Sequence, residues 1–206
     1  MFIIINNYQS PYKKYFLPLK KFLINYKKTN KSFDYIIISD FKQFEQFLNL
    51  NNKTIKGIII SGSNNSVINS SFQDFSLNLR IINHYSNKCP ILTICFGTQL
   101  IASLYGSSVK TMTNKIEGNH LTNITLKNYK LFDNLDKKNF NPNYNFNDKI
   151  LELPFSFKET SYIKYNNSKI ITSFFEPIKS IHCFLFHPEH KKNTEIILIN
   201  FINKCL

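Results

Sequence analysis

The chain has 206 residues and a formal net charge of +13 at pH 7, and 43% of its residues are hydrophobic and 15% aromatic. This composition excludes a disordered chain and suits one domain of ordinary size, so we expect a single domain over residues 1–206. The apolar runs are far shorter than the roughly 20 residues that cross a bilayer, and the one at the N-terminus ends too early for a signal peptide. We therefore expect a cytoplasmic protein with no membrane partner.

The positive charge is carried almost entirely by lysine, because Arg80 is the single arginine. Bidentate contacts to phosphates and base edges favour arginine, and the lysines are scattered along the chain. We therefore expect no specific nucleic-acid partner. Salt-screened attraction to polyanions stays open as an alternative.

The cysteines form no CxxC pair and no cluster with zinc-ligand spacing; they are Cys89, Cys95, Cys183 and Cys205. This spacing predicts free thiols, with neither a disulfide framework nor a metal site. We also expect no cofactor. Cys89 and Cys183 each precede or lie within an apolar run, which favours a packing role for both.

Short apolar runs alternate with segments of helical periodicity in the first half of the chain. The expected strands are residues 2–5, 33–39, 58–60 and 91–94, and the expected helices are residues 13–26, 41–50 and 72–85. Unbroken apolar strands that alternate with helices predict an α/β fold with an open, mostly parallel sheet covered on both faces. Ligands bind such sheets beyond the carboxyl ends of the strands.

The pattern changes in the second half of the chain. Residues 107–147 contain short alternating stretches separated by Asn-rich turns, which predict a small antiparallel or mixed extension. Residues 169–173 and 181–186 follow as late strands, joined by a hairpin across Glu176 and Pro177. A helix over residues 195–206 is expected at the end.

A thiol stands at a predicted strand-to-helix turn. The apolar run of residues 91–94 stops at Cys95, and Gly97 precedes the helical segment of residues 99–105. This is the pattern of a nucleophile elbow, where a sharp turn lifts a nucleophile clear of a sheet at a helix N-terminus. The helix dipole would stabilise a thiolate there, and the N–H group of Phe96 would be free to bind an oxyanion. A buried, inert Cys95 is the alternative that this stretch alone leaves open.

A histidine and a carboxylate stand two residues apart near the end of the chain, in the sequence His187-Pro188-Glu189. In an extended strand, side chains at positions i and i+2 point to the same side, so Glu189 could orient His187 as a general base. A strand-end turn with a surface glutamate is the alternative.

Other histidines compete for the role of base. His120 and His182 have no carboxylate two residues further on, so we expect them to be exposed or structural. His84 and His190 are expected on the surface.

Three motifs in order resemble class I, triad-type glutamine amidotransferases. They are GIIISGSNNSV at residues 57–67, ICFGTQ at residues 94–99 and FLFHPE at residues 184–189. The resemblance implies a flavodoxin-like fold and a catalytic triad of Cys95, His187 and Glu189. It also implies oxyanion binding by the backbone of Gly62 and Phe96, and glutamine binding by Gln99.

The implied reaction is hydrolysis of the side-chain amide of glutamine through a thioester on Cys95, which gives glutamate and ammonia. Within the family, the chain is most similar to the stand-alone amidotransferase subunits of GMP synthetases. This likeness implies glutamine as substrate and an ammonia-accepting synthase as partner.

Some positions differ from the family pattern. Thr93 stands where the family has glycine, Ser63 follows Gly62 where SGGP is usual, and Leu185 replaces a glutamine. In the family motif S-H-x-D-x-V, Asp148 matches but the histidine is absent. Two alternatives therefore stay open: a γ-glutamyl peptidase of the same superfamily, and a catalytically degenerate binding protein.

Overall fold

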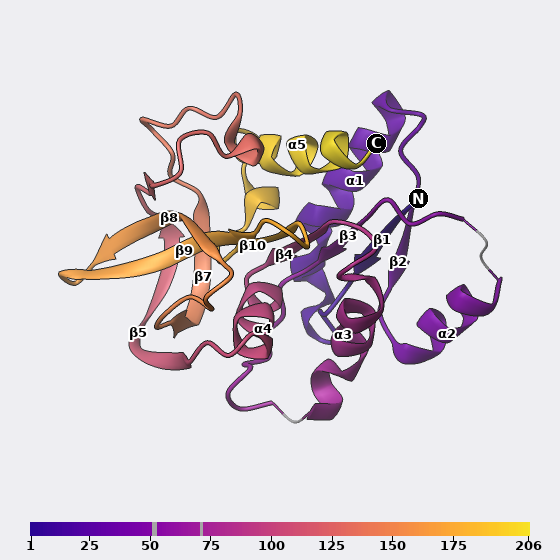
Figure 1. Cartoon of the computed structure of the whole chain (residues 1–206), viewed down its shortest axis with the longest axis horizontal. Helices are drawn as coiled ribbons and strands as arrows, with labels where there is room; N and C mark the ends of the chain where they lie inside the picture. Colours follow the sequence, from indigo (N-terminus) through magenta and orange to yellow (C-terminus); the bar gives the residue numbers. More distant parts are fainter. Residues whose placement is uncertain (51–52, 71) are drawn as a thin grey trace.

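An eight-stranded sheet runs through the centre of this computed structural model, which describes residues 1–50, 53–70 and 72–206 (Figure 1). The strands lie in the order β2-β1-β3-β4-β10-β9-β8-β6. Their bounds are β1 (Phe2–Ile5), β2 (Tyr35–Ile38), β3 (Gly57–Ile60), β4 (Ile91–Ile94), β6 (Asn123–Ile124), β8 (Lys158–Tyr165), β9 (Ser168–Glu176) and β10 (Ile181–Phe184). The pairs from β2 to β10 are parallel, and the pairs from β10 to β6 are antiparallel. The predicted open, mostly parallel sheet is confirmed.

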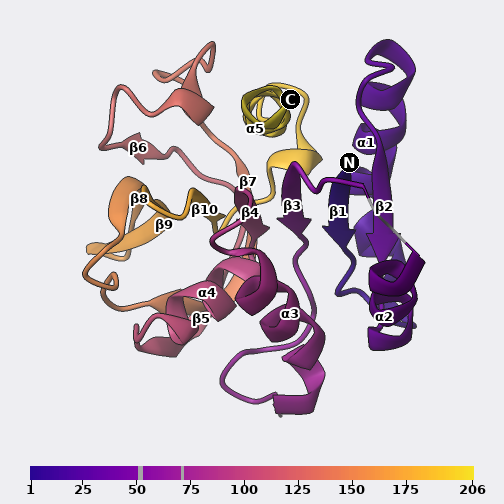
Figure 2. The ribbon, with the colours of Figure 1, turned by 45° about the vertical axis from the view of Figure 1, so that its right-hand side comes forward.

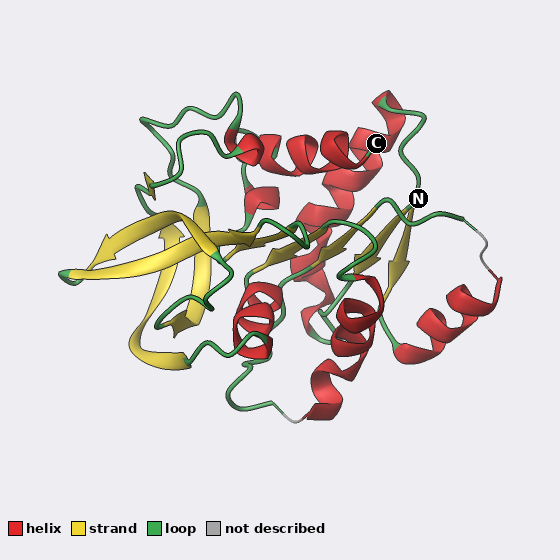
Figure 3. Cartoon of the chain, viewed as in Figure 1, coloured by secondary structure: helices red, strands yellow, loops and turns green. Residues whose placement is uncertain are grey.

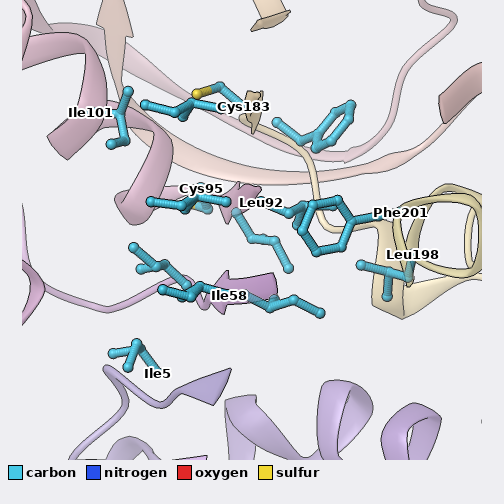
Figure 4. Close-up of a cluster of buried hydrophobic side chains, with 14 of the residues drawn as sticks. Ile5, Ile58, Leu92, Cys95, Ile101, Cys183, Leu198 and Phe201 are labelled. Carbon is cyan, nitrogen blue, oxygen red and sulfur yellow. The ribbon is translucent and has the colours of Figure 1, made fainter. Parts of the chain in front are cut away.

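The parallel strands are short apolar runs because both of their faces are covered. Every residue of β1, β3, β4 and β10 is buried. Strands buried on both faces carry continuous apolar sequence rather than alternation. Side chains on both faces of these strands build the core, and Figure 4 shows Ile5, Ile58 and Leu92 of successive strands stacked next to one another.

Helices cover the two faces of the parallel part of the sheet (Figures 2 and 3). α1 (Leu17–Thr29) and α5 (Ile196–Cys205) lie on one face, and α2 (Phe41–Leu50), α3 (Phe72–Tyr85) and α4 (Phe96–Leu104) lie on the other. Pro18 sits in the first turn of α1, where its missing N–H costs nothing. A 3-10 turn at Tyr12–Phe16 precedes it, so the predicted helix over residues 13–26 divides in two.

A second, two-stranded sheet lies beside α4. It pairs β5 (Val109–Asn119) with β7 (Asn143–Ile150) in antiparallel orientation, which confirms a small antiparallel extension. Two further 3-10 turns, Lys130–Phe132 and Pro188–His190, complete the regular elements. None of the helices in the described ranges is both long and apolar enough to cross a membrane.

β8 was not predicted, because polar residues stand at its buried positions. Thr160 and Ser161 of β8 are fully buried, and their hydroxyl groups hydrogen-bond Ser173 of β9 at 2.5 and 2.6 Å. Ser161 also hydrogen-bonds Thr172 at 2.9 Å. A buried hydroxyl that finds a partner costs little, so this strand needs no apolar alternation.

Candidate active site

Cys95 occupies a sharp turn between β4 and α4. Its φ of +50° and ψ of −107° are rare for a residue with a side chain, and such strain concentrates at functional sites. Its N–H donates to the carbonyl of Phe184 in β10 at 2.7 Å, and its own carbonyl accepts the N–H groups of Thr98 and Gln99. The predicted strand, turn and helix are therefore present, and Cys95 is 5% exposed.

The first turn of α4 passes very close to the sheet. A Cβ atom on Gly97 would lie 2.9 Å from Cγ2 of Ile60 and 3.2 Å from its carbonyl oxygen, so this position needs glycine. Thr93, which differs from the family pattern, is fully buried, and its hydroxyl pairs with that of Thr98 at 2.9 Å. The turn accommodates the threonine by giving its hydroxyl a partner.

His187 and Glu189 form a buried pair. Nδ1 of His187 lies 2.9 Å from Oε1 of Glu189, and each side chain is 3% exposed. The expectation of an extended strand through these residues was wrong, because β10 ends at Phe184 and Glu189 lies in the 3-10 turn that starts at Pro188. The turn, rather than a strand, brings the two side chains together. A surface position for Glu189 is also excluded.

The pair stabilises a positive charge on the imidazole. Burial by itself would lower the pKa of His187, but the negative charge of Glu189, together with hydrogen bonds to Cys95 and Glu189, raises it above its ordinary value. Burial would raise the pKa of Glu189, and the charge and hydrogen bond of His187 lower it instead. Oε2 of Glu189 is buried without a hydrogen-bond partner among the described residues.

His190 stacks on His187, with the ring centroids 4.8 Å apart. Its side chain is 26% exposed, and its Nε2 lies 3.9 Å from Oε1 of Glu189. Ligand atoms of His187, Glu189 and His190 fall within 4.8 Å of one another, which is close enough to hold a metal ion. Because the 2.9 Å hydrogen bond already joins Nδ1 of His187 to Oε1 of Glu189, we interpret the cluster as a hydrogen-bonded group.

A polar cavity of about 220 Å³ opens at Cys95. It is enclosed by the loop after β3, the 3-10 turn at Tyr12–Phe16, α4 and the β5–β7 sheet. Its lining residues are Tyr15, Ser63, Asn64, Asn65, Ser66, Cys95, Gln99, Lys115, Asn145, Phe146, Asn147 and Asp148. The thiol of Cys95 lines this cavity and donates to the carbonyl of Asn145 at 3.6 Å.

Hydrogen bonds hold the β7 wall of this cavity. Nε2 of Gln99 donates to the carbonyl of Asp148 at 2.8 Å, so this amide group is already engaged with the protein. The Asp148 carboxylate is buried and accepts the hydroxyl groups of Thr111 at 2.7 Å and Ser66 at 2.6 Å. The role of Gln99 in binding substrate stays a prediction, and its observed contact positions β7.

Gly62 faces the same residues from the end of β3. A Cβ atom there would lie 3.1 Å from Cε1 of His187 and 3.4 Å from Cβ of Cys95. The structure thus brings every predicted site residue to one end of the sheet: Gly62, Cys95, Phe96, Gln99, His187 and Glu189. Sequence analysis missed Tyr8, whose hydroxyl would lie 2.5 Å from the same Cβ atom.

His182 and His120 lie outside this cavity, as expected. His182 is buried, and its Nδ1 pairs with the hydroxyl of Tyr129 at 2.6 Å. Burial, with a smaller contribution from Lys204, lowers the pKa of His182 to about 3, so this imidazole is neutral. The Nε2 atom of His120 contacts the carbonyl of Glu117.

The family model for glutamine amidotransferase class-I matches residues 20–205. The chain belongs to the class I glutamine amidotransferase family. It is 35% identical over 169 residues to the glutamine-hydrolyzing GMP synthase of Petrotoga mobilis, a match that covers 81% of this chain and 31% of that protein. The chain thus spans about a third of the length of that relative. It is 32% identical over 156 residues to one of the subunits of the glutamine-hydrolyzing GMP synthase of Methanococcus aeolicus, and that match covers 75% of this chain and 76% of the subunit.

Solved structures share the fold of this amidotransferase. A crystal structure from Thermoplasma acidophilum, provisionally described as a GMP synthase subunit, superposes with a TM-score of 0.74 at 21% identity and covers 99% of this chain and 92% of that one. The glutaminase domain of the Trypanosoma brucei CTPS superposes with a TM-score of 0.68 at 11% identity, over 98% of this chain and 93% of that one.

Proposed function

We propose that the protein hydrolyses the side-chain amide of glutamine with Cys95, His187 and Glu189, and delivers the ammonia to a synthase. The observation that carries this proposal is the strained turn at Cys95, which places a thiol beside the buried His187–Glu189 pair in a chain of this family. The raised pKa of His187 supports an imidazolium beside Cys95 that can supply the proton for the leaving amide nitrogen.

In the first half of the reaction, the Cys95 thiolate adds to the γ-carbonyl carbon of glutamine. The N–H groups of Gly62 and Phe96 bind the oxygen that becomes negative, and Phe96 has such a group free because it opens α4. His187 then gives its proton to the amide nitrogen, and the carbon–nitrogen bond breaks. Ammonia leaves, and a γ-glutamyl thioester remains on Cys95.

In the second half, neutral His187 takes a proton from water as the water attacks the thioester. The carbon–sulfur bond breaks, glutamate leaves, and the thiolate–imidazolium pair returns. The carboxylate of Glu189 holds the ring in the orientation in which Nδ1 carries its hydrogen. It also stabilises each imidazolium state along this path.

The proposed partner is a synthase of the GMP-synthetase type that accepts ammonia. Its support is the match to the Methanococcus aeolicus protein, of which this chain covers 76%.

Release of glutamate from glutamine tests the proposal, with the chain alone and together with a synthase of the GMP-synthetase type. Labelling with a chloroketone analogue of glutamine, followed by peptide mass spectrometry, identifies the reacting thiol. We expect label on Cys95 and glutamate release that Cys95→Ala abolishes. Release from a γ-glutamyl dipeptide but not from glutamine would instead indicate a peptidase. An unlabelled Cys95 and no turnover of either substrate would indicate a degenerate binding protein.

A further inference from the structure

A tyrosine hydroxyl lies beside Gly62, one of the proposed oxyanion donors, and none of the sequence motifs assigns it a role. Tyr8 follows β1, and its side chain reaches the Cα atom of Gly62, because a Cβ atom there would lie 2.5 Å from the Tyr8 oxygen. The same Cβ atom would lie 3.1 Å from Cε1 of His187 and 3.4 Å from Cβ of Cys95. The hydroxyl group therefore shares one small space with the nucleophile and the base.

The backbone beside Tyr8 is tied to the Gly62 loop. The N–H of Asn7 donates to the hydroxyl of Ser61 at 3.0 Å, and the Asn7 side-chain amide donates to the Ser61 carbonyl at 3.0 Å. From the other direction, the hydroxyl of Ser63 donates to the carbonyl of Asn7 at 3.2 Å. These three bonds fix Tyr8 and Gly62 relative to each other, so the close approach is built into the fold.

The Tyr8 hydroxyl has a hydrogen to donate. The residue is 6% exposed, yet its hydroxyl makes no hydrogen bond to any part of the chain that the structure describes. Its oxygen is not among the fully buried, unpartnered polar atoms of the described residues, which are Oδ1 of Asn78 and Oε2 of Glu189, so the hydroxyl is open to solvent and free to donate to a ligand. Burial, then the negative charges of Cys95 and Glu189, raises the pKa of Tyr8, so the phenol stays protonated at neutral pH.

We propose that Tyr8 is a further catalytic residue, whose hydroxyl donates a hydrogen bond to the γ-carbonyl oxygen of glutamine as the thiolate adds to the carbonyl carbon. It would act beside the N–H groups of Gly62 and Phe96 as a third donor to that oxygen. This inference rests on the proposed glutaminase function. It differs from a role in holding the thiolate, which would require the hydroxyl to act before substrate binds.

Tyr8→Phe is the direct test, because it removes one oxygen atom and keeps the ring that packs on Tyr15. We expect kcat for glutamate release to fall about 100- to 1,000-fold, in the range measured for the loss of one oxyanion donor, with KM changed less than about twofold. Tyr12→Phe is the matched control: Tyr12 is 44% exposed and does not line the cavity, so the same change there should leave kcat and KM unaltered. Wild-type kcat in Tyr8→Phe would overturn the proposal.

Two alkylating reagents separate the oxyanion role from a thiolate role. The chloroketone analogue of glutamine places a carbonyl in the oxyanion site, whereas iodoacetamide requires only the thiolate. We expect Tyr8→Phe to slow labelling of Cys95 by the chloroketone and to leave its labelling by iodoacetamide unchanged. Equal slowing of both reactions, or of neither, would contradict the proposal. A wild-type protein that neither hydrolyses glutamine nor reacts with the chloroketone would contradict the proposed function itself, a pattern distinct from failure of Tyr8 alone.

Discussion

Replacement of Glu189 by glutamine removes the negative charge from the buried His187–Glu189 pair and leaves the shape of the side chain almost unchanged. The pKa of His187 is raised despite complete burial, and the Glu189 charge is the strongest influence that raises it. Each unit by which this pKa falls destabilises the imidazolium relative to the neutral ring by about 1.4 kcal/mol. A fall of two units would therefore shift the protonation equilibrium of His187 about 100-fold towards the neutral ring. Misorientation of the ring adds to this loss, and we expect kcat to fall about 100- to 10,000-fold with KM little changed.

The pH dependence of kcat gives a second measurement with a defined sign. His187 must be protonated to give its proton to the leaving amide nitrogen, so activity falls on the alkaline side as the imidazolium loses its proton. Because Glu189→Gln lowers the pKa of His187, the alkaline limb should move to lower pH. Glu45→Gln, the same change at an exposed position of α2, is the control. A variant Glu189→Gln with wild-type kcat and an unmoved limb would refute the assignment of this carboxylate.

Further predictions concern the nucleophile, the Gly62 position and a buried histidine. Cys95→Ser should lower kcat at least about 1,000-fold while the thermal midpoint stays close to that of wild type, and appreciable remaining turnover would exclude Cys95 as the nucleophile. Gly62→Ala introduces a Cβ atom 2.5 Å from the Tyr8 hydroxyl and should cost about 1–3 kcal/mol in denaturant unfolding. This cost should shrink in a Tyr8→Phe background, and an equal cost in both backgrounds would contradict the clash. His182 has a pKa of about 3 when folded and 6.5 as its ordinary value, so the unfolded chain alone takes up a proton between these values. Stability should therefore fall as the pH falls through this window by up to about 1.4 kcal/mol per unit, and His182→Gln should lower the slope of thermal midpoint against pH. An unchanged slope would show that other groups control the acid response.

The parallel half of the fold could be predicted because its strands are continuous apolar runs between helical segments. The predicted strand at residues 58–60 and the one at residues 91–94 match β3 and β4 to within one residue. The local pattern around Cys95 was equally informative, since a strand, a turn and a helix follow one another within 14 residues of chain from Ile91 to Leu104. The pattern of apolar residues was therefore sufficient to predict those elements that depend on residues close together in the sequence.

The missed features depend on contacts between distant parts of the chain. β8 carries the polar residues Thr160 and Ser161 at buried positions, so it lacks the apolar pattern of a strand. Their hydroxyl groups are stable in the interior because Ser173 of β9 supplies hydrogen-bond partners. Tyr8 approaches Gly62 where Asn7 is hydrogen-bonded to Ser61, 54 residues further on. The 3-10 turn that joins His187 to Glu189 likewise replaced the expected strand. Contacts between residues far apart in the sequence cannot be predicted from the local periodicity of apolar residues.

The proposed nucleophile and base follow the ends of the neighbouring strands β4 and β10, and this limits how a synthase partner of the proposed kind could act on them. The N–H of Cys95 bonds the carbonyl of Phe184, and the hydroxyl of Thr98 accepts the N–H of the same residue at 2.9 Å. The β4 and β10 ends are therefore bonded directly to each other. A synthase that switches turnover on would have to act on the opposite wall, where Asn145 contacts the thiol. We expect docking to change the admission of glutamine, while the intrinsic reactivity of the sulfur towards iodoacetamide stays constant.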